Sequence, residues 1–219
     1  MNKQDLFDSL AQYGVIPVIA IDDVQSAVPM ADALIEGGLP VAEITFRTAA
    51  AQAVINTLQK ERPRLILGAG TVLSVENLKL AKQCGAQFGV APGLNPGIVK
   101  EAQKLDLPFI PGVTTPSDIE RALGLGVNVL KFFPAEASGG VTMIKALSGP
   151  YAHKGVQFMP TGGVTMKNLE MYLSQPTVMM VGGTWIAKKE TIAGGKWGEI
   201  RENCRQVCNL VAQINKGGS

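Results

Sequence analysis

The chain has 219 residues, of which 46% are hydrophobic and 17% charged, and its 20 lysines and arginines against 18 aspartates and glutamates leave a net charge of +2. This length suits one domain or at most two small ones, and so large an apolar fraction excludes disorder of the whole chain. No basic block exceeds two residues, so the sequence offers no electrostatic footprint for nucleic acid or for an anionic membrane.

Short β-branched runs alternate with amphipathic segments along the whole chain. Strands are expected at residues 15–21, 41–45, 65–67, 87–90, 108–110, 128–133, 156–159 and 177–181. Helices are expected between them, and the last runs from about residue 196 to residue 215. Capping residues mark several helix starts, namely Thr48, Ser74, Asn95 before Pro96, and Thr115 before Pro116.

This pattern gives eight strand-helix units of about 27 residues each. Strict alternation is typical of a parallel sheet, so the sequence predicts an α/β fold, a single-domain (β/α)8 TIM barrel. An open doubly wound sheet is the competing interpretation. Against it, no Gly-x-Gly-x-x-Gly pattern follows the first strand, which ends in Ala20-Ile21-Asp22-Asp23.

The cysteines and the two termini bear on compartment and domain limits. Cys204 and Cys208 lie four residues apart on one expected helix, where a disulfide would be strained, so we expect a reduced, cytoplasmic chain. The polar residues 1–5 do not have the form of a signal peptide. No apolar stretch reaches the roughly 18 residues that span a bilayer. The domain is predicted to cover residues 1–216, followed by a flexible tail of residues 217–219.

In a barrel of this kind the chemistry lies at the carboxyl ends of the strands. Glu43 falls inside the apolar second strand, where burial of a carboxylate is unfavourable. One interpretation is a structural ion pair with Arg47 or a lysine. The other is a general acid-base whose pKa is raised by burial.

Lys131 lies at the end of the sixth predicted strand, with apolar neighbours on both sides. Desolvation disfavours its ammonium form, which leaves a neutral amine able to attack a carbonyl and form a Schiff base. The alternative is a lysine that extends past Phe132 to solvent.

The last two predicted strands end in Thr161-Gly162-Gly163 and Gly182-Gly183-Thr184. Paired glycines let backbone amides approach a ligand, and the loops after the seventh and eighth strands often form a phosphate site in this fold. The alternative is two tight turns that need glycine for their backbone angles.

The residues available for a metal site are few. His153 is the only histidine of the sequence. This excludes zinc sites built on several histidines, and it excludes a Ser-His-Asp arrangement that uses any histidine other than His153. The strand ends offer Glu43 almost alone as a carboxylate for magnesium. We therefore expect no metal and no cofactor.

The strand ends together resemble one enzyme family. They are Glu43-Ile44-Thr45-Phe46-Arg47, Gly68-Ala69-Gly70-Thr71, Ala91-Pro92-Gly93, Lys131-Phe132-Phe133-Pro134-Ala135-Glu136, Pro160-Thr161-Gly162-Gly163 and Gly182-Gly183-Thr184-Trp185. In this order along nearly the whole chain, they resemble the 2-keto-3-deoxy-6-phosphogluconate (KDPG) aldolase family, which includes the 4-hydroxy-2-oxoglutarate aldolases. The run from Lys131 to Glu136 is the most specific part of the resemblance.

The resemblance implies a metal-independent class I aldolase, a carbon-carbon lyase that is usually a homotrimer. Its substrates would be a small keto acid and a phosphorylated aldehyde, with no nucleic-acid or membrane partner. The low charged fraction is consistent with surface buried between subunits.

Residue roles also follow from the resemblance. It implies that Lys131 is the Schiff-base lysine and Glu43 the general acid-base. The remaining roles are carboxylate binding by Arg47 and Thr71, lining of the pocket by Phe133 and Pro92, and binding of the aldehyde and phosphate end by Thr161, Gly162, Gly163 and Thr184. At Thr184 the family pattern suggests serine instead, so the hydroxyl is kept and a methyl is added.

The preferred substrate stays open at this point. KDPG, its galactonate epimer (KDPGal) and 4-hydroxy-2-oxoglutarate share the keto-acid end and differ only at the distal end. A barrel that binds a phosphorylated ligand without catalysis is an alternative from another functional class, and the presence of both Glu43 and Lys131 argues against it.

Overall fold

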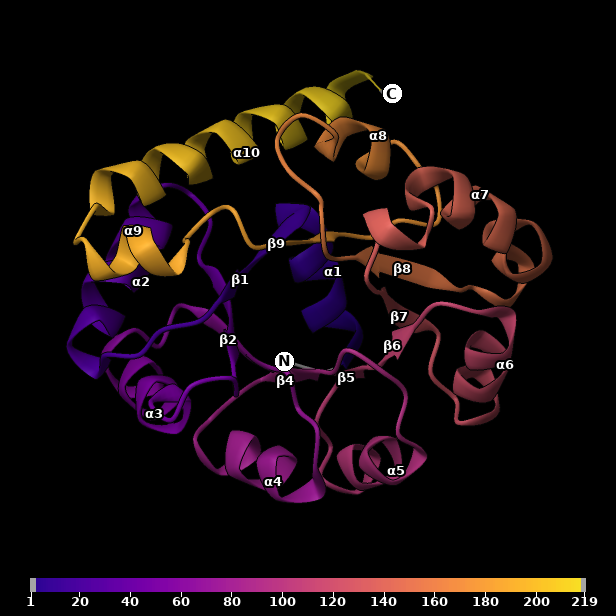
Figure 1. The fold of residues 1–219 in the computed structure, drawn as a ribbon, viewed down its shortest axis with the longest axis horizontal. Coiled ribbons are helices and arrows are strands. Elements are labelled where there is room, and N and C mark those ends of the chain that lie inside the picture. Colours follow the sequence, from indigo (N-terminus) through magenta and orange to yellow (C-terminus); the bar gives the residue numbers. More distant parts are fainter. Residues whose placement is uncertain (1–2, 218–219) are drawn as a thin grey trace.

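The strands form a ring in the middle of the molecule, and helices surround it (Figure 1). The structure is a computed structural model that describes the backbone of residues 3–217 and the side chains of residues 3–215. Its strands are β1 (Val15–Ile19), β2 (Val41–Thr45), β3 (Ile66–Gly70), β4 (Phe88–Val90), β5 (Phe109–Ile110), β6 (Gly112–Val113), β7 (Val129–Phe132), β8 (Gln157–Pro160) and β9 (Val181–Gly183).

Helices precede the first strand, follow most of the others and end the chain. The α-helices are α1 (Lys3–Tyr13), α2 (Ala27–Glu36), α3 (Ala51–Glu61), α4 (Val75–Gln83), α5 (Pro96–Lys104), α6 (Pro116–Gly124), α7 (Gly140–Tyr151), α8 (Leu169–Leu173), α9 (Lys189–Ala193) and α10 (Trp197–Gly217). Short 3₁₀ turns are η1 (Val24–Ser26), η2 (Glu136–Ser138) and η3 (Ala152–Lys154). No helix among the described residues is long and apolar enough to cross a membrane.

The paired strands are parallel and fall into two sheets. Their orders are β5-β4-β3-β2-β1-β9 and β6-β7-β8. Segment β5 matches the fifth predicted strand, residues 108–110. Segment β6 follows outside the predicted range, beyond Pro111, which has no N–H to donate to a ladder. One bridge between Thr161 and Gly182 connects the end of β8 with β9. The predicted α/β fold and its (β/α)8 order are confirmed, although the ladder of the described strands is not one closed ring.

The first three strands are buried along their whole length, as expected for a parallel sheet covered on both faces. Three predicted helix caps are confirmed: the side chains of Ser74, Asn95 and Thr115 accept hydrogen bonds from the first turns of α4, α5 and α6. At α6, Asp118 completes a capping box. These caps fix where each helix starts after its strand.

The predicted cap at Thr48 is wrong. The hydroxyl of Thr48 donates to the carbonyl oxygen of Ile21 at 2.7 Å, and α3 starts only after Ala50, whose side chain cannot cap. A neighbouring loop therefore competes with the helix for this hydroxyl. The end of β1 and the turn after β2 are joined as a result.

Other boundaries also differ from the prediction. The last strand is centred later than predicted, because residue 178 makes only a single bridge and the regular segment is β9. Helix α8 starts at Leu169 rather than near Thr165. Helix α10 includes Gly217, the first residue of the predicted tail. Gly218 and Ser219 lie outside the described residues.

Helix α1 is absent from the sequence prediction. It buries Leu6, Phe7 and Leu10 and crosses the centre of the ring (Figure 1). Lys3 and Phe7 share a hollow of about 350 Å³ with residues at the amino ends of β7 and β8, including Val129 and Gln157. The helix therefore covers the amino-terminal end of the barrel.

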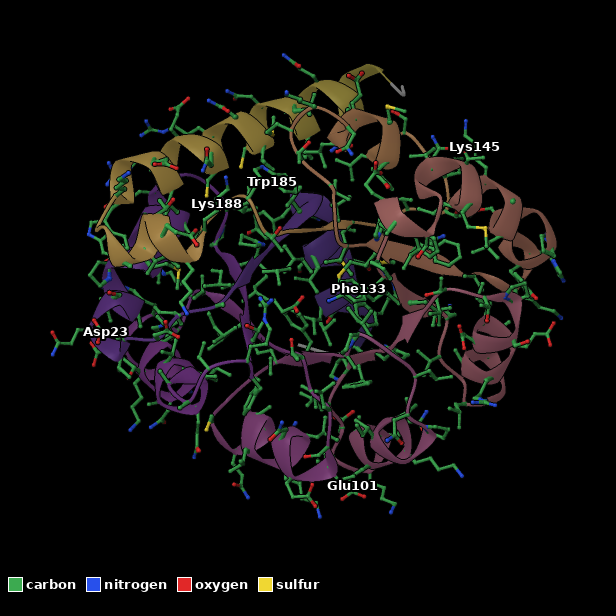
Figure 2. The ribbon with its side chains drawn as sticks, in the orientation of Figure 1. Asp23, Glu101, Phe133, Lys145, Trp185 and Lys188 are labelled. Atoms are coloured by element: carbon green, nitrogen blue, oxygen red, sulfur yellow. The ribbon has the colours of Figure 1, made fainter. Side chains whose placement is uncertain are left out.

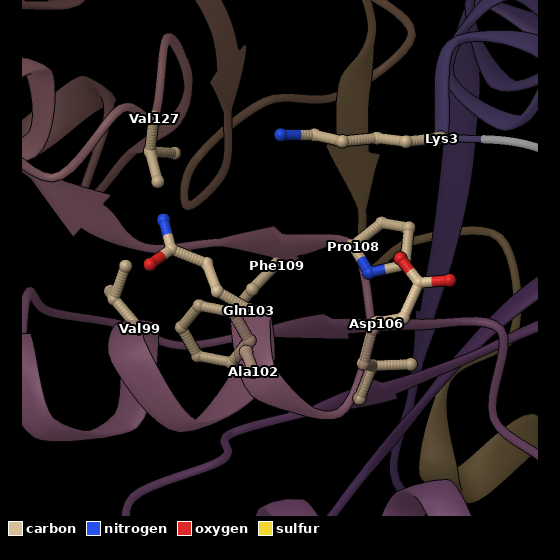
Figure 3. Close-up of a pocket in the computed structure, with 9 residues that line it drawn as sticks. Lys3, Val99, Ala102, Gln103, Asp106, Pro108, Phe109 and Val127 are labelled. Atoms are coloured by element: carbon tan, nitrogen blue, oxygen red, sulfur yellow. The ribbon is translucent and has the colours of Figure 1, made fainter.

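A second hollow, of about 170 Å³, lies at this same end (Figure 3). Lys3, Gln103, Asp106 and Phe109 are among the residues that line it. None of the predicted site residues lines it, so any site built from them lies at the opposite, carboxyl end of the strands.

Candidate active site

The predicted site residues lie within strands or directly after them. Lys131 is in β7 and Glu43 in β2, while the others follow a carboxyl end: Arg47 after β2, Thr71 after β3, Pro92 after β4, Phe133 after β7, Thr161, Gly162 and Gly163 after β8, and Thr184 after β9. Phe133 lies toward the middle of the ring, whereas Asp23 and Glu101 lie at its rim (Figure 2). The fold thus gathers the chosen residues at one end of the barrel.

Lys131 and Glu43 face each other inside the barrel. The Lys131 Nζ lies 3.8 Å from Glu43 Oε1, and the two side chains are 7% and 0% exposed. This separation excludes a normal hydrogen bond but keeps the two groups in strong electrostatic contact. The alternative in which Lys131 extends past Phe132 to solvent is therefore wrong.

Burial determines the protonation chemistry of Glu43. Neither carboxylate oxygen has a hydrogen-bond partner among the described residues. Desolvation raises the pKa of this carboxyl above its ordinary value, against the opposing pull of the positive charges on Lys131 and Arg47. A carboxyl group whose pKa is raised in this way can both accept and return a proton at a higher pH than an ordinary glutamate can.

Gly70 makes the space that Glu43 occupies. A Cβ atom at position 70 would collide with Glu43 Oε1 and would come within 2.8 Å of the carboxyl carbon. No residue with a side chain fits here unless the carboxylate moves. The glycine at the end of β3 therefore has a packing role in the site, not only a role in the turn.

Phe133 places an aromatic ring beside the lysine. Its ring centre lies 5.3 Å from Lys131 Nζ, within the range of a cation–π contact. Its carbonyl oxygen accepts a hydrogen bond of 2.7 Å from the hydroxyl of Thr114, which follows β6. A Cβ added to Gly162 would lie 3.4 Å from the ring, so Phe133 connects the lysine with the glycine turn.

Arg47 is exposed and its guanidinium is oriented by Thr45. Arg47 Nε donates to Thr45 Oγ1 at 3.2 Å, while that hydroxyl donates to the carbonyl oxygen of Ile19 at 2.9 Å. Thr45 is itself buried. With Nε held in this way, both terminal nitrogens of the guanidinium remain for a planar anion such as a carboxylate.

Thr71 has a backbone conformation that is unusual for its type. Its φ is +55°, although it is not glycine. Such strain concentrates at functional sites, because only strong surrounding structure maintains it. Pro92 lines a neighbouring hollow of about 260 Å³ together with Val72 and the exposed Leu73.

The glycine turn after β8 has left-handed backbone angles at both glycines, with φ of +98° at Gly162 and +83° at Gly163. Thr161 just before it is buried, and a Cβ at Gly182 would collide with its hydroxyl. Thr184 is exposed, and its side chain makes no hydrogen bond to the turn among the described residues. The structure thus joins Thr161, Gly162 and Gly163, and leaves Thr184 at the rim of the same end of the barrel.

Among the described residues, no group of three or more His, Cys, Asp or Glu side chains is arranged to hold a metal ion. The cysteine sulfurs of Cys84, Cys204 and Cys208 are free thiols. Burial raises the pKa of Cys204 to about 12.

Sequence reasoning missed several residues of this arrangement. Thr45 and Gly70 lie within the strand-end motifs, but their roles are not evident from sequence because their contacts depend on how neighbouring strands meet. Glu136 closes the most specific motif, but its position in the sequence indicates no function. Tyr172, which donates a hydrogen bond to Glu136, carries no signal in the sequence at all.

A sequence model of the KDPG and KHG aldolase family matches residues 7–203 of the chain. Among known proteins, the 2-dehydro-3-deoxy-phosphogluconate aldolase of Haemophilus influenzae is 48% identical over 210 residues, which cover 96% of this chain and 98% of that protein. The KHG/KDPG aldolase of Escherichia coli is 40% identical over 193 residues, covering 88% of this chain and 90% of the other.

A solved structure is similar over nearly the same length. The KDPG aldolase of Legionella pneumophila, with pyruvate captured at low pH as a covalent carbinolamine intermediate, superposes with a TM-score of 0.89 at 40% identity. The superposition covers 94% of this chain and 98% of that one.

The packing of Gly70 against Glu43 gives a prediction about stability. Gly70→Ala is expected to lower the free energy of unfolding by about 1–3 kcal/mol, because the new methyl group overpacks a buried site. Urea denaturation followed by circular dichroism measures this change.

Gly198→Ala is the matched control, since Gly198 lies in α10 and an added Cβ meets no atom within 4 Å. The control should keep or raise stability by up to about 1 kcal/mol. Equal stability of the Gly70→Ala protein and the parent would show that Glu43 does not need this space.

Proposed function

Because this chain belongs to the KDPG and KHG aldolase family, we infer that it is a class I aldolase, which cleaves KDPG to pyruvate and glyceraldehyde 3-phosphate through a Schiff base. One observation supports the roles of its residues more than any other: the buried lysine of β7 lies 3.8 Å from a buried carboxylate with no other partner among the described residues. A nucleophile and a proton-transfer group are thus placed side by side in surroundings shielded from water.

In the proposed reaction, Lys131 acts as the nucleophile. Its neutral amine attacks the C2 ketone of the substrate, and the resulting carbinolamine loses water to give a protonated imine. The imine then accepts the electron pair released when the C3–C4 bond breaks.

Glu43 is assigned the proton transfers. As a carboxylate it removes the proton of the C4 hydroxyl, so that the C4 oxygen becomes the aldehyde of the departing glyceraldehyde 3-phosphate. The same group, now protonated, returns a proton to C3 of the enamine, and hydrolysis of the imine releases pyruvate and restores Lys131. One group performs both steps because burial brings its pKa toward neutral pH.

The keto-acid end of the substrate is assigned to Arg47, Thr71, Phe133 and Pro92. The guanidinium oriented by Thr45 supplies two parallel donors for the carboxylate, a geometry that lysine does not offer. Thr71 follows β3 with a strained backbone conformation, and its hydroxyl is assigned to the same carboxylate. The Phe133 ring beside the lysine shields the imine from water.

The distal phosphate is assigned to Thr161, Gly162, Gly163 and Thr184. Two successive glycines leave backbone N–H groups open to an anion at the end of β8. Relatives of this chain carry both KDPG and KHG in their names, and the keto-acid end would serve either substrate. KDPGal differs from KDPG only in configuration and is the third candidate.

Further parts of the proposal concern metal, assembly and location. No step above requires a metal ion, so the enzyme is proposed to be metal-independent. The low charged fraction of 17% supports surface buried between subunits, and the family resemblance suggests that the assembly is a homotrimer. The three free thiols support a cytoplasmic location.

Trapping with pyruvate tests the nucleophile. Borohydride added to the protein with pyruvate is expected to reduce the imine and leave a stable adduct on Lys131, which peptide mass spectrometry detects. The same yield is expected with excess EDTA. Lys131→Met should give no adduct and no retro-aldol turnover. An adduct on another lysine, or turnover by the Lys131→Met protein, would contradict the assignment.

The raised pKa of Glu43 predicts the acid side of the pH profile. In the imine complex Lys131 is already consumed, so kcat reports the ionisation of Glu43. Because only the carboxylate accepts the C4 proton, kcat should fall as the pH drops. The midpoint of this fall should lie above pH 4.5, which is the ordinary pKa of a glutamate side chain.

Glu43→Gln provides the comparison for that profile. It should lower kcat by about 10²–10⁴ and abolish the acid limb, since no carboxyl is left to titrate. Full activity of the parent down to pH 4.5, or an unchanged profile in the variant, would contradict the role of Glu43.

A coupled assay of pyruvate release tests the substrate. We expect kcat/KM to be greater for KDPG than for 4-hydroxy-2-oxoglutarate, because only the phosphorylated substrates engage the glycine turn. KDPGal carries the same phosphate, so its assay in parallel measures the preference for configuration. A preference for 4-hydroxy-2-oxoglutarate would make that activity the main one. Binding of phosphorylated ligands without turnover of any of the three would indicate a non-catalytic barrel.

A further inference from the structure

The loop that follows the lysine strand is hydrogen-bonded to the glycine turn of the next strand. Past the end of β7, the N–H of Ala135 donates to the carbonyl of Thr161 at 2.8 Å, and the N–H of Glu136 donates to that of Gly162 at 3.0 Å. The parallel pairing of β7 and β8 thus continues beyond both strands. Any movement of the glycine turn must break these bonds.

The Glu136 side chain packs against the second glycine of the turn. A Cβ at Gly163 would lie 2.5 Å from Glu136 Cγ and 2.6 Å from its Cβ. On another side, a Cβ at Gly140 would lie 3.1 Å from Glu136 Oε1. The side chain therefore occupies a narrow space between the turn and the start of α7, and both glycines are needed to make it.

Tyr172 holds the far end of this side chain. Its hydroxyl donates a hydrogen bond to Glu136 Oε1, across 36 positions of sequence. Tyr172 is fully buried on α8, the helix that comes next after the turn. Burial and the neighbouring Glu136 carboxylate raise the pKa of Tyr172 above its ordinary value, so the hydroxyl keeps the proton that it donates.

This bond matters for the turn because of its backbone angles. With φ of +98° and +83°, Gly162 and Gly163 adopt conformations that are not held by any side chain of their own. Glu136 contacts the turn through its backbone and through its side chain, and Tyr172 fixes that side chain. A hydrogen bond from a buried hydroxyl to a carboxylate is among the stronger ones in proteins.

We propose that Tyr172 and Glu136 are positioning residues that fix the Gly162–Gly163 turn and thereby determine the preference for substrates with a terminal phosphate. The inference rests on the proposed function, in which this turn receives the phosphate. Among the described residues, the pair makes no hydrogen bond or ion pair with Lys131, Glu43 or Arg47. Its main effect is therefore expected at the distal end of the substrate.

The test is Tyr172→Phe, which removes one buried hydroxyl and keeps the ring. We expect kcat/KM for KDPG to fall about three- to tenfold, mainly through KM, as for one lost hydrogen bond. For 4-hydroxy-2-oxoglutarate, which has no phosphate, the change should stay below about twofold, and borohydride trapping of pyruvate on Lys131 should be unchanged. A merely structural role would lower thermal stability but leave the ratio between the two substrates unaltered.

Tyr151→Phe is the matched control. Tyr151 also donates to a glutamate, Glu120, at 3.0 Å, but this bond joins α7 to α6 in the outer layer of helices. The control should leave the substrate ratio as in the parent. Glu136→Ala should reproduce the selective loss for KDPG. Because the two residues act as one unit, kcat/KM of the Tyr172→Phe, Glu136→Ala double variant should fall no further than that of the more impaired single variant.

The outcomes separate the two proposals. If the parent protein cleaves KDPG but Tyr172→Phe and Glu136→Ala lower both substrates equally or neither, the positioning role is wrong while the aldolase function stands. Failure of the parent protein to cleave KDPG would overturn both.

Discussion

Two ionisable side chains with almost no exposure, Lys131 and Glu43, face each other within the barrel at 3.8 Å. Removing two such groups from water is unfavourable by several kcal/mol for each ion, and their mutual attraction repays it only with good geometry and further hydrogen bonds. Glu43 has no such bonds among the described residues. The pair is thus a poor source of stability and a good source of reactivity, because the Glu43 carboxylate lacks hydrogen-bond partners among the described residues.

The surrounding fold must supply the stability that this pair does not. The strands that carry the two residues are buried on both faces, and α1 covers the amino end of the barrel, away from the chemistry. Gly70 leaves space for the carboxylate at the end of a neighbouring strand. Stability and function therefore lie at opposite ends of the barrel, a division that this architecture favours in general.

Much of this was predictable from the sequence, and the remainder was not for identifiable reasons. The alternation of strands and helices, and the apolar neighbours of Glu43 and Lys131, are local features that predict the fold and the reactive pair. Helix α1 is not predictable in this way, since Phe7 is buried next to a hollow that it shares with Val129 and Gln157, far along the chain. The hydroxyl of Thr48 bonds to Ile21 instead of capping α3 for a similar reason. Tyr172 lies 36 residues from its partner Glu136, and no spacing rule connects the two.

The two halves of the proposed substrate meet different kinds of structure. The keto-acid half meets side chains anchored in strands: Lys131, Glu43 and an Arg47 oriented by the buried Thr45. The distal half meets a turn of two glycines, whose shape comes from neighbours rather than from its own side chains. Since the strands are constrained by the barrel and the turn only by a few contacts, changes of substrate preference need not disturb the reactive pair. A change at the contacts of Glu136 would alter what the turn accepts and leave the bond-breaking groups in place.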